Sequence, residues 1–395
     1  MKSDWQETTI GEITESCLGK MLDKKKNKGT LQPYLANVNV RWGEFELDSL
    51  SLMKFEESEQ ERYGLKYGDI VLCEGGEPGR CAIWRNQLPN IKIQKALHRI
   101  RAHENVDNEY LYYWLLHAGR SGILRKYFTG STIQHLPGDK LKSINLFIPP
   151  LNYQRRVARV LSCIDAKIEA NKQINDNLEQ QAAAMFRDLF ITQADPSWTE
   201  GTISDLGTVV GGSTPSKAKA EYYTEHGIAW ITPKDLSVDK SKFISHGADD
   251  ITELGLHNSS ASIMPKGTVL FSSRAPIGYI AIADGDVTTN QGFKSVVPHS
   301  NIGTAFVYFF LKDALPIIEG MASGSTFKEI SGSAMRTVPA VIPDDATLQR
   351  FSAFCEPIFE QQRSLERQNR LLASFRDMLL PRLMSGEIDV SNITL

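Results

Sequence analysis

The chain has 395 residues, and its 44 lysines and arginines against 47 aspartates and glutamates give a formal net charge of −3. This length allows two or three domains, each with its own core. A charged content of 23% and a hydrophobic content of 41% exclude a chain that is disordered throughout. The near-neutral charge, taken alone, points away from nucleic-acid binding.

The termini and the cysteines narrow the class further. No run of about 18 apolar residues occurs, so we expect no membrane-spanning helix and no membrane partner. The N-terminal segment lacks the apolar core of a signal peptide, so we expect a cytoplasmic protein. The five cysteines are an odd number without C-x-x-C spacing, which argues against a disulfide framework and against a zinc site.

The first half of the sequence recurs in the second half. WQETTIGEI (Trp5 to Ile13) matches WTEGTISDL (Trp198 to Leu206), and GSTIQHLPG from Gly130 matches GSTFKEISG from Gly324. Between them, LYYWLL matches AFVYFF in the same order and at nearly the same offset. Agreement of order and spacing over this length predicts an internal duplication.

The duplication predicts an α+β fold built as a globular unit, a helix, a second globular unit and a second helix. We predict globular domains at 1–150 and 196–345 and helical segments at 151–195 and 346–395. The globular segments combine short β-branched runs with Gly/Pro/Ser turns. One helix is expected in each globular domain, near 109–119 and 303–318.

Each helical segment carries a heptad seam. A 3.5-residue apolar period is typical of a coiled coil, and Asn171 and Asn369 would set its register. Pro357 predicts that the second helix kinks or begins there. The alternative is that each helix packs on its own domain. The predicted spacer residues are Leu161, Ile164, Ile168, Asn171, Leu178, Met185, Ile358, Leu365, Asn369, Leu372 and Leu379.

Motifs of common catalytic sites are missing. The sequence has no G-x-x-x-x-G-K-[ST], no H-E-x-x-H and no G-x-S-x-G motif. We therefore predict a binding protein with no catalytic residues, no metal site and no cofactor of its own.

Charge is distributed unevenly along the chain. Residues 1–150 carry a formal charge of +2 and residues 196–345 carry −5. The one dense basic cluster consists of Lys20, Lys24, Lys25, Lys26 and Lys28. Lys24, Lys25, Lys26 and Lys28 are candidate contacts to DNA phosphates, and the alternative is an ordinary solvated loop.

Three loop types recur in both halves. Residues 19–28 correspond to 211–217, residues 75–80 to 273–278, and residues 130–134 to 324–328. Small residues allow close backbone approach, and hydroxyls, amides and arginines supply donors for phosphates and base edges. Arg80 and Arg274 are the candidates for reading guanine, and the alternative is that all these loops are structural turns. The candidate residues are Arg80, Ser131, Thr132, Gln134, Thr214, Ser216, Lys217, Arg274, Ser325, Thr326 and Lys328.

The layout resembles the specificity subunit of a type I restriction-modification system. FIPPLNYQRRVARVLSCIDAKIEANKQINDNLEQQAAAMFRDLF (Phe147 to Phe190) and LERQNRLLASFRDMLLPRLMSGEIDV (Leu365 to Val390) resemble the two helical regions of that family. The G-S-T segments and the paired tryptophan segments are similar to parts of its two target-recognition domains. The position of the second motif predicts that the second helix is the shorter one.

The resemblance implies a mechanism without chemistry in this chain. Each globular domain would read one half of an interrupted target in double-stranded DNA, and two antiparallel helices would hold the halves about 50 Å apart. Two DNA adenine methyltransferase subunits would dock on the helices and use S-adenosylmethionine. Restriction subunits, with ATP and Mg²⁺, would join that complex. The competing hypothesis is a coiled-coil scaffold with two ligand-binding domains that does not bind DNA.

Overall fold

The computed structural model of the chain describes residues 4–23, 27–324 and 328–391. The chain divides into two compact units. The first comprises the residues up to 168 together with those from 371 onward, and the second comprises residues 169–370. Each unit contains one globular part and a portion of each of two long helices, α5 (Leu151–Arg187) and α12 (Asp345–Met384).

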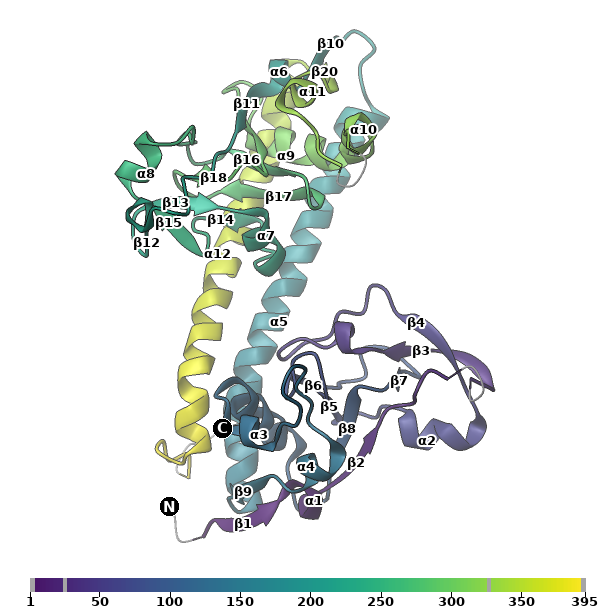
Figure 1. Cartoon of the computed structure of the whole chain (residues 1–395). Coiled ribbons are helices and arrows are strands. Elements are labelled where there is room, and N and C mark those ends of the chain that lie inside the picture. The colour runs from purple at the N-terminus through teal and green to yellow at the C-terminus, as the bar shows by residue number, and fades with distance from the viewer. Residues whose placement is uncertain (1–3, 24–26, 325–327, 392–395) are drawn as a thin grey trace. The chain divides into compact units, whose positions relative to one another are not determined.

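The first unit is built on small, mostly antiparallel sheets (Figure 1). A two-stranded sheet pairs β1 (Gln6–Thr9) with β9 (Asn145–Ile148). A four-stranded sheet has the order β2 (Thr14–Leu18), β8 (Leu97–Ala102), β5 (Ile70–Cys73) and β6 (Cys81–Ile83). A three-stranded sheet has the order β4 (Ser51–Phe55), β3 (Thr30–Leu35) and β7 (Lys92–Ile93).

Helix α3 (Asn108–Arg120) lies against the four-stranded sheet and supplies much of the first core. Asp107 caps its start, because the Asp107 carboxylate accepts a 2.9 Å hydrogen bond from the backbone N–H of Tyr110. Tyr110, Leu111 and Leu115 are fully buried on the inner face. Every residue of β5 is buried, so this strand lies at the centre of the unit.

The second unit repeats this plan with more strands. Its sheets are the pair β10 (Thr199–Thr202) and β20 (Pro339–Ile342), a five-stranded sheet and a four-stranded sheet. The five-stranded order is β11 (Gly207–Gly211), β19 (Lys294–Pro298), β16 (Val269–Ser273), β17 (Ile277–Ala283) and β14 (Phe243–Ile244). The four-stranded order is β12 (Tyr223–Thr224), β15 (Asp249–Ile251), β13 (Ile228–Ile231) and β18 (Thr288–Thr289).

The duplication is confirmed at the level of strand register. Gln6 pairs with Ile148 in the first unit, and Thr199 pairs with Ile342 in the second. A short helix follows the first strand of each unit, α1 (Ile10–Ile13) and α6 (Ile203–Leu206), and each begins with a capping box. The helix expected near 303–318 is divided into α9 (Thr304–Asp313) and α10 (Leu315–Met321) by a break just before Pro316.

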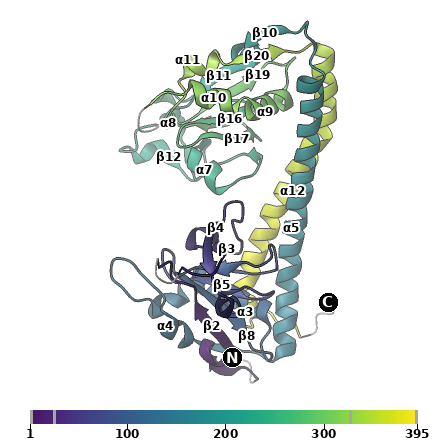
Figure 2. The ribbon, with the colours of Figure 1, turned by 90° about the vertical axis from the view of Figure 1, so that its right-hand side faces the viewer.

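Helices α5 and α12 lie side by side and antiparallel (Figures 1 and 2). In the first unit Asp165 pairs with Arg376, and in the second Asn171 bonds Asn369, so partner numbers fall along α12 as they rise along α5. Each spacer residue predicted from the heptad pattern is buried or half-buried. The helices therefore pack on one another, and the alternative of independent surface helices is wrong.

The second helix is shorter than the first by two residues, and it does not begin at Pro357. Helix α12 has 40 residues, whereas α5 and the π-helical turn that continues it (Asp188–Thr192) together cover 42. The last turns of α12 lie within the Leu365–Val390 motif, and Leu380 and Leu383 are buried there in the first core. The helix begins at Asp345 rather than at Pro357, because Phe351 and Cys355 are buried in the second core and hold the preceding turns helical.

The shorter helices join these sheets at their edges. They are α2 (Gln60–Tyr63), α4 (Gly138–Lys142), α7 (Pro233–Val238), α8 (Glu253–His257) and α11 (Gly332–Arg336). Within the described residues, no helix is both long and apolar enough to span a membrane.

Candidate nucleic-acid interface

The recurring loops of the first unit are hydrogen-bonded to one another. The loop after β5 begins at Glu74, whose N–H donates to the carbonyl of Ala96 at 2.8 Å. The carbonyl of Glu74 accepts from the N–H of Leu136 at 2.7 Å, and Gly75 forms a bridge with His135. The loop at 75–80 therefore lies between the loop at 130–134 and the turn that precedes β8.

The second unit has the same arrangement. The N–H of Ser273 donates to the carbonyl of Gly292 at 2.7 Å, and the carbonyl of Ser273 accepts from the N–H of Ile330 at 3.1 Å. Arg274 forms a bridge with Glu329, as Gly75 does with His135. Because both units share these bonds, the cluster is a property of the duplicated fold.

The first recurring loop joins the same cluster. In the first unit the N–H of Lys95 donates to the carbonyl of Lys20 at 2.9 Å. In the second unit the N–H of Ser213 donates to the carbonyl of Thr289 at 2.9 Å. Gly212 is required there, because a Cβ atom would lie 2.0 Å from the carbonyl oxygen of Asn290. We use the name loop cluster for residues 19–23, 27–28, 75–80, 94–96 and 130–135 in the first unit and 211–217, 273–278, 289–292, 323–324 and 328–329 in the second.

An open cavity of about 400 Å³ lies beside the loop cluster of the second unit. Three sequence candidates, Thr214, Lys217 and Arg274, line it together. Lys234 from α7 and the amides of Asn290 and Gln291 complete its polar lining. The accessible lining of the cavity is mostly apolar, and the exposed Lys217 and Lys234 place two cations beside it that are available to phosphates.

Arg274 is half-exposed and lies opposite a carboxylate. One guanidinium nitrogen is 3.4 Å from the Glu329 carboxylate, which also lies 3.6 Å from the Nζ of Lys294. The side chain of Arg274 is 37% exposed and that of Glu329 is 36% exposed. A pair this exposed is weak, so a phosphate or a guanine could compete with Glu329 for Arg274.

Arg80 is held more tightly than Arg274. Its guanidinium donates to Glu77 at 2.9 Å and to the backbone carbonyl of Asn37 at 2.9 Å. The side chain is only 13% exposed. In this geometry Arg80 braces its own loop, and guanine reading by Arg80 remains a prediction that would require those bonds to open.

The tips of the remaining loops are open to solvent. Two hydrogen bonds between Thr129 and His135 close the base of the 130–134 loop, and its Ser131, Thr132 and Gln134 are exposed. Further exposed candidates are Lys28, Ser216 and Lys328. The predictions for Lys24, Lys25, Lys26, Ser325 and Thr326 lie outside the described residues.

Lys20 is not part of an open basic cluster. Only 3% of the residue is exposed, and its ammonium donates to the carbonyl of Lys54 at 2.9 Å and pairs with Glu59. It also lies 5.1 Å from the centre of the Phe55 ring. Lys20 therefore anchors the loop, because its backbone belongs to the bridge with Gln94.

Sequence reasoning missed Lys234, Asn290 and Gln291. The Asn-Gln-Gly sequence between two β-branched runs predicts a turn, but no local signal places that turn beside Thr214. The contact arises because the side chain of Thr214 bonds that of Gln291 across the sheet edge. Lys234 reaches the cavity from a helix that opens with a Thr232–Asp235 capping box.

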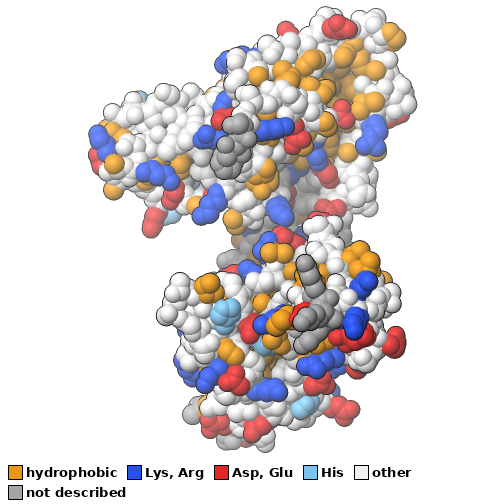
Figure 3. Space-filling view, turned by 45° about the vertical axis from the view of Figure 1, so that its right-hand side comes forward, with side chains coloured by type: hydrophobic (Ala, Val, Ile, Leu, Met, Phe, Trp, Pro, Cys, Tyr) orange, Lys and Arg blue, Asp and Glu red, His pale blue; other side chains and the backbone are white. Residues whose placement is uncertain are grey.

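The surface charge agrees with the near-neutral composition. Over the face drawn in Figure 3, lysines and arginines are interspersed with acidic residues in both units. Among the described residues, no group of three or more His, Cys, Asp or Glu side chains is placed to hold a metal ion.

Comparisons with known proteins agree with this geometry. The family model of the type I restriction modification DNA specificity domain matches residues 2–180 and again residues 196–372. The chain is similar to the type I restriction enzyme MjaIX specificity subunit of Methanocaldococcus jannaschii, with 36% identity over 189 residues, which is 47% of this chain and 44% of that protein. It is also similar to the HindI specificity subunit of Haemophilus influenzae, with 23% identity over 98% of this chain and 100% of that protein.

A solved structure shares the fold. The S subunit of a type I restriction-modification system from M. genitalium superposes with a TM-score of 0.56 at 18% identity, and the match covers 96% of each chain. The family model covers most of the present chain and does so twice, once for each unit. The chain therefore belongs to the type I restriction-modification DNA specificity family.

Proposed function

We propose that this chain reads a bipartite DNA target, one half with the loop cluster of each unit. The observation that carries the proposal is the repetition of one hydrogen-bonded frame with different side chains on it. Gln134 of the first unit corresponds to Lys328 of the second, and the loop that holds Arg80 differs from the one that holds Arg274. Two unlike reading surfaces on one duplicated frame suit two unlike half-sites.

The paired helices are proposed to set the gap between the half-sites. A helix of 37 residues, the length of α5, spans about 55 Å. This span exceeds one turn of DNA, so both loop clusters could act on one duplex without reading the base pairs between them. The seam of α5 and α12 would keep that distance constant.

The family is non-catalytic within the type I complex, which confirms the predictions that the chain is not an enzyme and carries no cofactor. We propose that two DNA adenine methyltransferase subunits dock on the helices and bring S-adenosylmethionine. Restriction subunits that use ATP and Mg²⁺ would join the same complex in the cytoplasm. Such partners would also supply positive surface that this chain, with its net charge of −3, lacks.

Methylation mapping tests the proposal. The chain is produced with its methylation subunits in a host without other adenine methylation, and the methylated sites are sequenced. We expect one interrupted motif, and we expect no methylation by the chain alone. Arg274→Ala should relax one half-site and leave the other half-site unchanged, with Arg336→Ala, outside the loop cluster, as the matched control. A continuous motif or methyl transfer by the pure chain would contradict the proposal.

A second experiment tests the role of the helices. One heptad is inserted after Ile168 in α5 and one before Leu371 in α12, which preserves the seam. Seven residues add about 10 Å, or roughly three base pairs, to the gap. Both half-sites should stay the same, and a changed half-site would count against the proposal.

The competing scaffold hypothesis makes a different prediction. A scaffold that does not bind DNA shows no salt-dependent association with a duplex, whereas phosphate neutralisation weakens binding steeply as salt rises.

A further inference from the structure

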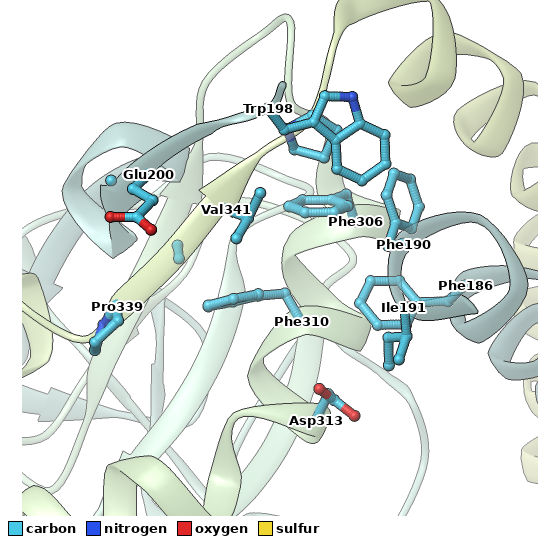
Figure 4. A pocket seen from close by; sticks show the side chains of 13 residues that line it. Phe186, Phe190, Ile191, Trp198, Glu200, Phe306, Phe310, Asp313, Pro339 and Val341 are labelled. Atoms are coloured by element: carbon cyan, nitrogen blue, oxygen red, sulfur yellow. The ribbon is translucent and has the colours of Figure 1, made fainter. Parts of the chain in front are cut away.

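The second unit contains an apolar pocket that is separate from its loop cluster. The pocket has a volume of about 440 Å³ and shares no lining residue with the cavity at Arg274. Figure 4 shows the rings of Trp198, Phe306 and Phe310 gathered in it. Ile191 and Val341, which also line it, are 49% and 47% exposed. Exposed apolar side chains around an open pocket are typical of a binding site.

The walls of the pocket are preformed. Phe190 lies at the end of α5 in a π-helical turn (Asp188–Thr192), and its ring centre is 4.7 Å from that of Phe306 and 5.2 Å from that of Phe351. Trp198 lies 6.0 Å from Phe190, and its indole N–H donates to Asp344 at 3.0 Å. These contacts orient the rings without a ligand.

The corresponding positions of the first unit carry larger side chains. The β1–β9 and β10–β20 registers align Gly201 with Thr8 and Ala340 with Leu146. Leu146 is buried in the first core, with 3% of the residue exposed. The fold therefore accepts a leucine at the position of Ala340, whereas a Cβ atom at Gly201 would lie 2.7 Å from the Cδ1 atom of Ile342.

Two carboxylates lie at the margin of the pocket. Glu200 and Asp313 are both exposed and lie on different sides of the apolar side chains in Figure 4. Neither forms an ion pair with any part of the chain that the structure describes. An apolar pocket flanked by free carboxylates complements an apolar side chain with lysine or arginine beside it.

We propose that this pocket binds a segment of a partner protein, in which an aromatic or branched aliphatic side chain enters the pocket and adjacent basic residues pair with Glu200 and Asp313. The inference does not depend on DNA reading, because the pocket and the loop cluster have no residue in common.

Fluorescence anisotropy with the full chain tests the proposal. The probe is a fluorescein-labelled peptide of sequence Gly-Lys-Leu-Phe-Arg-Gly. We expect saturable binding that weakens at least tenfold when Leu and Phe in the peptide are both replaced by Ala. A similar loss is expected when Lys and Arg in the peptide are replaced by Glu.

Variants of the chain locate the site. Ala340→Leu copies the residue of the first unit and should fill the pocket, and Glu200→Lys with Asp313→Lys should remove the charge complement. Each should weaken binding at least tenfold. The matched control is Glu225→Lys, an exposed carboxylate on the turn between β12 and β13. Circular dichroism and DNA binding establish that each variant is folded and that its loop cluster is intact.

Three results would overturn the proposal. The first is no saturable binding of the peptide to the wild-type chain. The second is equal binding by the wild-type chain and by both pocket variants. The third is binding of free indole as tight as that of the peptide, which would make the pocket a site for small apolar molecules.

Discussion

Removal of two cations from the cavity of the second unit should change the salt dependence of DNA binding. Lys217 and Lys234 are exposed and line the cavity beside Arg274. Each phosphate that a lysine neutralises contributes about 0.9 to the slope of log K against log[salt]. If each lysine contacts one phosphate, the double change Lys217→Gln and Lys234→Gln should flatten the slope by about 1.8.

This slope difference has a direct consequence for affinity. Between 50 and 200 mM salt, the wild-type chain should lose roughly 12-fold more affinity than the double variant. The assay is anisotropy of a fluorescein-labelled duplex titrated with the purified chain at several salt concentrations. Because phosphate contacts do not depend on sequence, the duplex need not contain the target.

A double variant of the same charge change serves as the control. Lys240→Gln and Lys266→Gln remove two exposed cations that do not line the cavity, so their slope should stay close to that of the wild type. Equal slopes for the wild type and for the Lys217 and Lys234 variant would refute the assignment of this cavity to DNA. Equal flattening by the control pair would show that net charge, rather than position, governs binding.

Three further predictions concern stability and are measured by urea unfolding. Asp165→Ala removes the carboxylate that accepts a 2.6 Å hydrogen bond from the Tyr113 hydroxyl and pairs with Arg376 at 2.7 Å. The unfolding free energy should therefore fall by about 3 kcal/mol, and a loss below 1 kcal/mol would contradict this prediction. Asn171→Leu removes a buried amide that donates to the side chains of Gln368 and Asn369, and it should cost about 1–2 kcal/mol. The additional change Asn369→Leu should restore the loss, and a further loss would count against the reasoning. Burial lowers the pKa of Lys242 to about 8, so above pH 8 the folded chain releases a proton that the unfolded chain retains. From pH 8 to 9 the unfolding free energy of the wild type should therefore rise by about 1 kcal/mol relative to that of Lys242→Met. An unchanged difference between the two unfolding free energies would refute this prediction.

Local signals were sufficient for the elements and their repetition. The heptad pattern predicted which side chains of α5 and α12 face inward, because a 3.5-residue period depends only on the sequence of one helix. The effect of Pro357 was not predictable locally, because burial of Phe351 and Cys355 in the second core extends α12 upstream to Asp345.

The candidate site was predictable only in part. The loops were identified because they recur, but their contacts with one another depend on how the strands are ordered in each sheet. Lys20 is five residues or fewer from Lys24 and Lys25 in sequence, yet it is buried on Glu59 and Phe55. The number of lysines in a segment does not predict which of them are exposed to solvent, because exposure depends on the residues that folding packs against each one.

The sequence by itself determined that the protein is built twice, that two helices join its halves and that catalytic motifs are missing. These properties depend on order, spacing and periodicity, all of which are local. Only the tertiary structure decided which loops meet, that Arg274 lines a cavity while Arg80 is hydrogen-bonded within the protein, and that Trp198, Phe306 and Phe310 line a pocket. Those features arise where strands that are distant in sequence pair with one another, so no single segment of the sequence predicts their contacts.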